Sequence, residues 1–238
     1  MVFIYDFDGT LTPFSTPQYE TLKDCGYSDE SFMSLIGAIK NSGNMSIYEA
    51  YFLAYQKILE NNDLLFDKNT VCKGANSVQF NKGILSYFQN LKEKGVKSYV
   101  ITSNFEEYVE NTPIASYLTR VYGTTFIEEA GKYSKLDRLV TDQRKVSIIE
   151  EIKNQEQVSY NNIVYFGDGL TDKDAFEFVH SNGGISVFVG EGGKENNNYI
   201  CLSALGIIDE CFKPDFSVDT GLYQFVDSKI HQETIVKK

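Results

Sequence analysis

Near its start the chain reads Val2-Phe3-Ile4-Tyr5-Asp6-Phe7-Asp8-Gly9-Thr10-Leu11-Thr12. An apolar run that ends in a glycine turn is typical of a buried parallel strand. Side chains alternate between the two faces of a strand, so we expect Asp6 and Asp8 to share a face and Phe7 to point into the core. Two neighbouring carboxylates repel each other, and a divalent cation relieves that repulsion. The pair therefore indicates an oxygen-ligand metal site, although it could equally begin a solvated loop.

The bulk composition limits the classes of protein to consider. The 238 residues are 42% hydrophobic and 23% charged, which is ordinary for a globular protein. This length allows one large domain, or a core with a smaller appendage. The net charge of −11 lacks the basic face that nucleic acid requires, so we expect no nucleic-acid partner.

The cellular location of the protein and the redox state of its cysteines are predicted from sequence patterns that it lacks. The sequence has no secretory signal before the first strand and no run of about 18 apolar residues. The four cysteines show no metal-binding spacing, and there are only two histidines, which argues against a structural zinc site. We expect a cytoplasmic protein with reduced thiols and no membrane association. The sequence does not indicate an oligomeric state.

Residues 13–80 differ in character from the rest of the chain. Apolar residues recur at helical spacing in 29–40 and 46–60, and Ser46 with Glu49 has the spacing of a capping box. The segment is long for a crossover between two parallel strands. We expect residues 13–80 to form a small helical cap, inserted between residues 1–12 and 81–238 of an α/β core. Alternatively, these helices belong to the main helical layer.

From residue 81 onward, strands and helices alternate. Strands are predicted at 96–101, 122–128, 163–166 and 186–189, and a short edge strand around Phe216 and Val218. Helical spacing occupies most of the segments between them, including 106–118 with an interruption at Pro113, while 132–143 has no clear pattern. This alternation predicts a parallel sheet covered by helices.

Three of the predicted strands end in acidic or hydroxyl side chains: Asp6 and Asp8, Thr102 and Ser103, Asp168 and Asp172. The carboxyl ends of parallel strands lie on one edge of a sheet, where α/β proteins bind ligands. Residues more than 160 positions apart could therefore form one site. The convergence is much stronger support for a functional site than any one cluster.

These clusters resemble the motifs of the haloacid dehalogenase-like (HAD) superfamily. Asp6-Phe7-Asp8-Gly9-Thr10-Leu11-Thr12 resembles its DxDGT(L/I)T signature, Ile101-Thr102-Ser103 is similar to its second motif, and Gly167-Asp168-Gly169-Leu170-Thr171-Asp172 resembles its GDGxxD motif. The matches follow the family order over residues 1 to about 180. The layout is most similar to phosphoserine phosphatase-like members, whose small helical cap follows the first motif. The resemblance implies a Rossmann-like parallel α/β core with a small α-helical cap.

The third motif of the family is a single basic residue, for which Lys145 is the candidate. A cation near a helix N-terminus opposes the helix dipole, so its location is unfavourable unless an anion is bound there. Lys145 also precedes Asp168 by 23 residues (168 − 145), which is about one helix and one turn. Arg144, Lys135 and Lys132 remain competitors.

The resemblance implies a Mg²⁺-dependent phosphatase that hydrolyses a small phosphorylated metabolite through an aspartyl-phosphate on Asp6. Asp8 would be the general acid and base. The implied catalytic residues are Asp6, Asp8, Thr102 and Lys145. The implied substrate-binding residues are Phe7, Thr102, Ser103 and Lys145. The implied metal site comprises Asp6, Asp8, Asp168 and Asp172.

Two other functions are compatible with the same residues. A phosphotransferase or mutase would pass the aspartyl-phosphate to a second substrate, and a phosphorylatable switch would keep it without turnover. Residues 13–80 contain no arginine that could bind a substrate carboxylate bidentately. This departure leaves phosphoserine in doubt as the substrate, and no motif names another.

Overall fold

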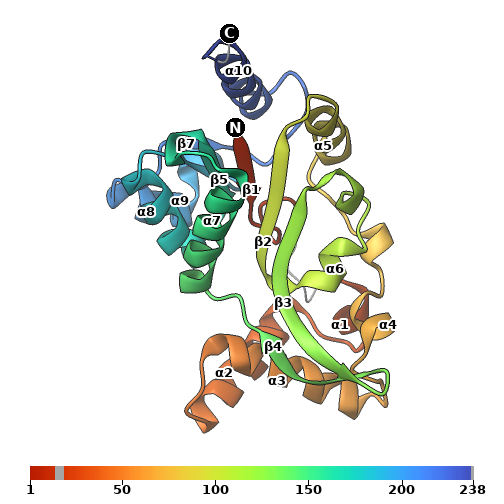
Figure 1. The fold of residues 1–238 in the computed structure, drawn as a ribbon. Helices are drawn as coiled ribbons and strands as arrows, with labels where there is room; N and C mark the ends of the chain where they lie inside the picture. The colour runs from red at the N-terminus through yellow and green to blue at the C-terminus, as the bar shows by residue number, and fades with distance from the viewer. Residues whose placement is uncertain (14–18, 237–238) are drawn as a thin grey trace.

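The computed structural model describes residues 1–13 and 19–236, with the backbone alone described for 232–236. Residues 14–18, which belong to the expected cap, and residues 237–238 lie outside the described residues. A seven-stranded sheet with the order β4-β3-β2-β1-β5-β6-β7 forms the centre of the molecule (Figure 1). Every pairing is parallel except that of β3 with β4. The predicted α/β class with a parallel sheet is confirmed.

The strands have the following bounds: β1 Val2–Tyr5, β2 Lys97–Phe105, β3 Arg120–Glu129, β4 Lys132–Arg138, β5 Ile163–Gly167, β6 Ile185–Val189 and β7 Glu210–Phe212. The α-helices are α1 Glu20–Asp24, α2 Asp29–Ser42, α3 Ile47–Asn61, α4 Lys68–Val71, α5 Ile84–Glu93, α6 Glu106–Glu110, α7 Asp142–Glu156, α8 Lys173–Ser181, α9 Asn197–Ala204 and α10 Gly221–Val236.

The central strand β1 divides the core into two faces. Val2 and Ile4 pack with residues of α7, α8 and α9, whereas Phe3, Tyr5 and Phe7 pack on the opposite face with α5 and α10. The two sets of helices lie on either side of the sheet in Figure 1. This alternation with a period of two residues is the expected one for a strand buried on both faces. Continued past Tyr5, it turns Asp6 toward the face that α7 covers.

The region that follows β2 differs from the sequence prediction. Residues 132–138, which showed no clear pattern, form β4 of a long hairpin with β3. The helix predicted over 106–118, with an interruption at Pro113, is too long, because α6 ends at Glu110 and only a short 3₁₀ turn at Ala115–Tyr117 follows Pro113. The predicted edge strand at Phe216 and Val218 is also wrong. The edge strand is β7, and the Phe216 amide instead donates to the Lys82 carbonyl at 2.8 Å.

The expected cap segment carries α1 to α4. Both long helices begin at serine caps, and the predicted capping box is present, with the Ser46 amide 2.8 Å from Glu49 Oε2 and the Glu49 amide 3.2 Å from Ser46 Oγ. The β3–β4 hairpin reaches these helices (Figure 1). Phe126 on β3 packs against Phe52 and Phe66, with ring centroids 5.3 and 5.0 Å apart. The apolar packing around α3 therefore includes side chains from outside residues 13–80.

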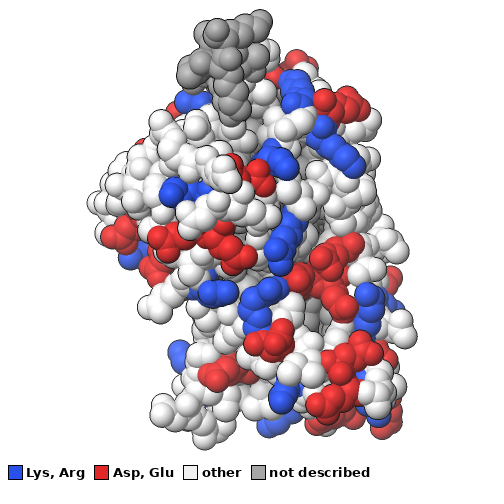
Figure 2. Space-filling model, viewed as in Figure 1, with Lys and Arg blue, Asp and Glu red and all other residues white. Residues whose placement is uncertain are grey.

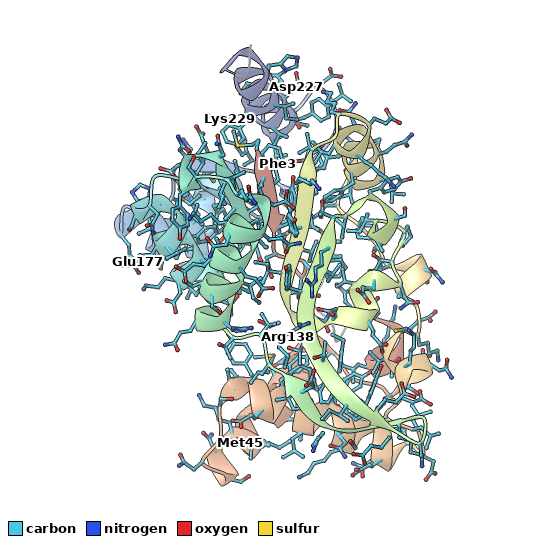
Figure 3. All side chains as sticks on the ribbon, viewed as in Figure 1. Phe3, Met45, Arg138, Glu177, Asp227 and Lys229 are labelled. Carbon is cyan, nitrogen blue, oxygen red and sulfur yellow. The ribbon has the colours of Figure 1, made fainter. Side chains whose placement is uncertain are left out.

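Figure 3 shows where labelled side chains lie along the molecule, including one at the base of the β3–β4 hairpin. Met45, between α2 and α3, lies at the opposite end from Asp227 on α10. Arg138 lies between them, where its Nε donates to the Gly123 carbonyl at 3.0 Å and its guanidinium pairs with Glu106. These bonds join the end of β4 to β3 and α6, so the hairpin has a fixed base.

Part of the acidity lies over α6 and the β3–β4 hairpin. Acidic side chains crowd this part of the face shown in Figure 2, and Glu106, Glu107, Glu110 and Glu128 line one cavity there. Within the described residues we find no helix with the length and apolar character needed to cross a membrane.

Candidate active site

The loop after β1 is held against the end of β5. The Asp6 amide donates to the Phe166 carbonyl at 2.8 Å, and the Asp6 side chain is almost fully buried. Gly9 has a φ of +83°, and a Cβ atom placed there would lie 2.2 Å from Asp168 Oδ2. Thr10 Oγ1 donates to Asp168 Oδ1 at 3.3 Å. Only glycine therefore lets Asp168 approach this loop.

Lys145 is the basic residue that reaches the end of β1. Its Nζ lies 2.9 Å from Asp6 Oδ1 and 2.7 Å from Asp172 Oδ1, and the residue is 1% exposed. It is the fourth residue of α7, whose N-cap Thr141 accepts a hydrogen bond from the Arg144 amide. Burial opposes the charge on Lys145, but Asp172 and Asp6 outweigh it and raise the lysine pKa well above its usual value.

The other basic candidates lie at the surface. Arg144, Lys132 and Lys135 are all exposed, and the Arg144 guanidinium donates to Ser147 Oγ at 3.0 Å. Among the residues whose burial is described, Lys145 is the one buried lysine or arginine. Burial therefore distinguishes Lys145 from the three other basic residues that the sequence left as alternatives for the third motif.

Asp172 holds several groups together at the end of β5. Its Oδ1 accepts from Lys145 Nζ and from the Tyr165 hydroxyl at 2.6 Å. Its Oδ2 accepts from the Asp168 and Gly169 amides at 3.2 and 3.3 Å. Both carboxylate oxygens are therefore engaged, and the side chain orients Lys145 and the loop that carries Asp168.

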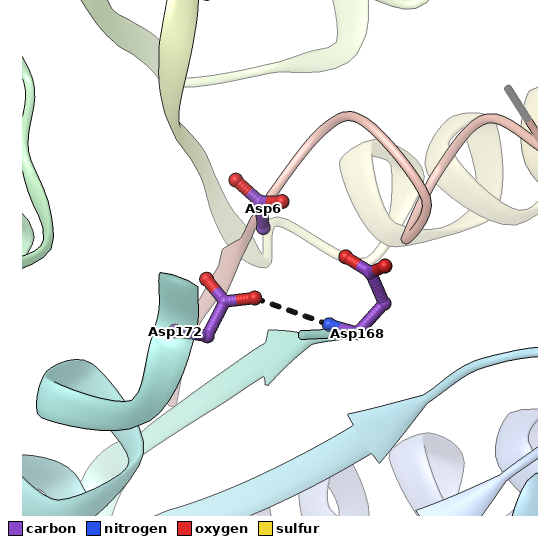
Figure 4. Close-up of side chains that lie close together, drawn as sticks. All are labelled: Asp6, Asp168 and Asp172. Atoms are coloured by element: carbon purple, nitrogen blue, oxygen red, sulfur yellow. Dashed lines mark hydrogen bonds between the residues drawn. The ribbon is translucent and has the colours of Figure 1, made fainter. Parts of the chain in front are cut away.

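Three carboxylates converge where the loops after β1 and β5 meet. Ligand oxygens of Asp6, Asp168 and Asp172 all lie within 4.8 Å of one another (Figure 4). Burial raises the Asp6 pKa to about 7 despite the opposing effect of Lys145, and burial together with Asp172 and Asp6 raises the Asp168 pKa well above its usual value. A single lysine does not balance this buried negative charge. Hard oxygen donors with excess negative charge fit a divalent cation such as Mg²⁺.

Asp8 has different partners from Asp6. The Tyr19 hydroxyl donates to Asp8 Oδ1 at 2.7 Å, and Asn104 Nδ2 donates to Asp8 Oδ2 at 3.1 Å. Burial raises the Asp8 pKa to about 6, while these two hydrogen bonds oppose the rise. The two acids of the first motif therefore occupy separate environments, although they are two residues apart.

The second motif lies at the end of β2, in the strand itself. Thr102 is 1% exposed, and its Oγ1 accepts from the Asn104 amide at 3.0 Å. The pairing of β2 with β3 shifts register between Ile101 and Phe105, so this short segment departs from regular pairing. Ser103 and Asn104 are left to line a cavity beside Asp8.

The Phe7 side chain is buried in the core, as the strand pattern predicts. Its ring packs against Phe80 and Tyr108, with centroids 6.3 and 6.5 Å apart. A contact between Phe7 and a substrate would therefore have to use its backbone.

Three residues of the site were not found by sequence reasoning. Asn104 belongs to the polar end of β2, so its position beside Thr102 and Ser103 could have indicated a site residue. Tyr19 counted only as one of many aromatic residues in the cap segment, and Tyr165 as one apolar residue of a buried strand. Their hydroxyl contacts to Asp8 and Asp172 depend on chain segments that are distant in sequence.

A cavity of about 230 Å³ lies between the cap helices and the sheet edge. Its core side consists of Asp8, Ser103, Asn104 and Thr171. Its cap side consists of Asp29, Phe32, Met33, Ile36, Ile47, Tyr48, Tyr51 and Phe52. The Tyr48 hydroxyl also hydrogen-bonds to Asp142 at the start of α7. The cavity is thus closed on one side by α2 and α3, and Asp8 connects it to the carboxylate cluster.

Comparison with known proteins identifies the family. Residues 3–177 match the family model of haloacid dehalogenase-like hydrolases. The chain belongs to this family. The predicted family and the predicted hydrolase class are therefore confirmed.

The individual relatives described next share only 20% to 26% sequence identity with this chain. An uncharacterized protein of Borreliella burgdorferi is 23% identical to this haloacid dehalogenase-like hydrolase and covers 95% of both chains. A phosphoserine phosphatase of Archaeoglobus fulgidus is 26% identical over 40% of this chain and 28% of its own length. A phospho-aspartyl intermediate analogue of phosphoserine phosphatase superimposes with a TM-score of 0.59 at 20% identity, and covers 88% of this chain and 91% of that one. The structural likeness supports the same fold.

Proposed function

We propose that this hydrolase is a Mg²⁺-dependent phosphatase that releases phosphate from a small phosphomonoester through an aspartyl-phosphate on Asp6. One observation carries the proposal. Asp6 is bound by the buried Lys145 and lies beside Asp168, whereas Asp8 lines the adjoining cavity. A nucleophile, a cation and a second acid are thereby arranged around one position. The similarity to phosphoserine phosphatases supports the same reaction class.

In the first half-reaction, a carboxylate oxygen of Asp6 attacks phosphorus and the bond from phosphorus to the alcohol oxygen breaks. Asp8 gives its proton to the departing alkoxide, which leaves as the neutral alcohol. The Tyr19 and Asn104 hydrogen bonds hold the Asp8 carboxyl in one orientation throughout.

In the second half-reaction, Asp8 takes a proton from a water molecule as that water attacks phosphorus. The bond between phosphorus and the Asp6 oxygen breaks, and inorganic phosphate leaves. Asp6 is then again a carboxylate and Asp8 again carries a proton, so the cycle closes. Water is thus the acceptor that separates a phosphatase from a phosphotransferase.

We assign stabilisation of the charge on the transferring group to Lys145, the Thr102 hydroxyl and the Ser103 backbone amide. Asp6, Asp168 and the Asp8 backbone carbonyl would hold the metal, which supplies positive charge next to the phosphoryl oxygens when bound. We assign Asp172 to positioning, because both of its oxygens accept hydrogen bonds from Lys145, Tyr165 and the loop amides.

Residues 13–80 would form the lid over this site. Its helices α2 and α3 supply most of the cavity wall, and Tyr48 bonds across to Asp142 of the core. A lid of this kind excludes bulk water while the phosphate is transferred. The cytoplasmic location and the absence of a nucleic-acid partner stay predictions.

The test is release of inorganic phosphate from p-nitrophenyl phosphate, with detection of the covalent phosphate by mass spectrometry after acid quenching. We expect Mg²⁺-dependent turnover that EDTA abolishes. Asp6→Asn keeps the shape of the side chain and should lower kcat by about 10³-fold or more. Asp219→Asn, at an exposed position before α10, is the matched control and should not change it.

Three results would contradict the proposal. Full turnover by Asp6→Asn would remove the nucleophile from the mechanism. Preferential transfer of phosphate to an added alcohol or sugar phosphate would make the protein a phosphotransferase or mutase. A long-lived phospho-aspartate without hydrolysis would make it a phosphorylatable switch.

A further inference from the structure

The cavity beside Asp8 locates the alcohol portion of the substrate. This step rests on the proposed function, in which Asp8 protonates the leaving oxygen. A general acid must lie within hydrogen-bond reach of the atom that receives its proton. Asp8 lines the cavity, so the carbon skeleton attached to that oxygen extends between Asp8 and the cap helices. The walls of the cavity then select the substrate.

The cap side of these walls is largely apolar. Phe32 and Ile36 project from α2, and Phe52 from α3, and all three are buried. The Phe32 ring meets the Tyr51 ring at 5.1 Å in an edge-to-face arrangement, and Tyr51 meets Phe52 at 5.0 Å. Binding of an apolar group against these walls is favourable because its surface leaves water. A charged group would lose its hydration there and find few polar partners.

The charges on the walls disfavour a second anion. No lysine or arginine is among the described residues that line the cavity, and Asp29 is the charged residue that the cap contributes. A substrate carboxylate would lose its hydration here and would face the Asp29 carboxylate, with no lysine or arginine among the described lining residues. Like-charge contacts of this kind are a common means of rejecting a wrong ligand.

The size of the cavity limits the alcohol further. Its volume of about 230 Å³ lies below the range of about 300–1,000 Å³ that is typical of pockets for drug-sized ligands. A short alkyl chain or a single ring fills such a space.

We propose that the substrate is the phosphomonoester of a small apolar alcohol, with no carboxylate and no second phosphate. This differs from the amino-acid ester phosphoserine, whose carboxylate has no partner in the cavity. The specificity residues are the apolar side chains of α2 and α3, with Asp29 as the group that rejects anions.

The test compares kcat/KM for methyl phosphate, n-butyl phosphate, phenyl phosphate and O-phosphoserine in the Mg²⁺-loaded full chain. We expect n-butyl and phenyl phosphate to exceed methyl phosphate by about tenfold or more, because they fill the cavity. We expect them to exceed O-phosphoserine by about 100-fold, because its carboxylate remains unpaired.

Met33→Arg supplies the missing cation. Met33 lines the cavity and is 51% exposed, so a longer polar side chain fits there without disturbing the core. It should raise kcat/KM for O-phosphoserine and lower it for n-butyl phosphate. Leu65→Arg, at a 50% exposed position between α3 and α4, is the matched control and should leave the ratio of the two substrates unchanged.

The outcomes distinguish this inference from the function on which it rests. Hydrolysis of methyl phosphate together with O-phosphoserine at or above the rate for n-butyl phosphate would overturn the inference and leave the phosphatase intact. An unchanged ratio in Met33→Arg would also overturn it. Failure to hydrolyse any of the four esters would overturn the phosphatase function itself, and the inference with it.

Discussion

The carboxyl edge of the sheet and the cap cavity are adjacent but are built in opposite ways. At the edge, Asp6, Lys145 and Asp172 are almost fully buried and joined by short hydrogen bonds. On the cavity wall, Met33 and Ile47 are 51% and 43% exposed and contribute apolar surface. Charges stabilise a transition state most when they are already oriented in a water-poor site. A cavity wall that selects an apolar group depends on its shape and its apolar area. Its side chains can therefore be partly exposed, and we expect substitutions there to have smaller effects.

This contrast predicts that the largest effects come from changes at the edge. Lys145→Met removes the cation but keeps a side chain of similar length. It leaves the Asp6 and Asp172 carboxylates buried without their partner, so we expect a loss of about 3–5 kcal/mol in the free energy of unfolding of the metal-free protein. Loss of one charged donor to the transferring phosphoryl group should lower kcat by about 10²–10³-fold. Urea denaturation and steady-state kinetics measure the two effects.

Arg144→Met is the control for that prediction, because it also replaces a positive charge with methionine, one residue earlier at an exposed position of α7. We expect a change within about 0.5 kcal/mol in stability and no change in kcat. If Arg144→Met were the variant that lost activity, the basic residue of the site would have been misassigned.

Metal binding should produce the next largest effect, again at the edge. A divalent cation neutralises the repulsion among Asp6, Asp168 and Asp172, so Mg²⁺ should stabilise the folded chain. At a concentration 100 times Kd the gain is about 2.7 kcal/mol. For a chain of this size that gain raises Tm by roughly 5–10 °C. Thermal melts with Mg²⁺ and with EDTA measure the difference.

Asp168→Asn should change both melts, in opposite directions. Burial and its acidic neighbours raise the Asp168 pKa, which means that the charged form is unfavourable in the metal-free fold. Asn removes that charge, so the metal-free variant should melt at or above the temperature of the unmodified protein. The gain from Mg²⁺ should nearly disappear. A full Mg²⁺ shift in Asp168→Asn would place the cation elsewhere.

The smallest effect is expected at the bond that joins the two regions. The Tyr48 hydroxyl of α3 hydrogen-bonds to Asp142 at the start of α7, which joins these two helices. Tyr48→Phe removes this bond, at a cost of about 1 kcal/mol, and should raise KM about fivefold while kcat stays constant. Tyr27→Phe, at a partly buried position elsewhere in the cap, should change neither constant. A fall in kcat without a change in KM would instead assign Tyr48 to the chemical step.

The limits of sequence prediction in this protein have specific causes. The strand β1 was predictable because all four of its residues are buried and apolar. The strand β4 was not, because most of its residues are exposed on an antiparallel hairpin and the alternation is weak. The helix predicted over 106–118, with an interruption at Pro113, was too long because its apolar spacing continues past Glu110, where α6 ends.

The sequence by itself determined the α/β class and the residues at the strand ends, because burial patterns and turn residues act locally and parallel strands share one edge. Only the tertiary structure decided which of four basic residues meets Asp6, since burial of Lys145 depends on how α7 packs on the sheet. It also separated the surroundings of Asp6 from those of Asp8, and it gathered apolar side chains from two helices around one cavity. These features depend on contacts between segments that are distant in the chain, and no local pattern encodes them.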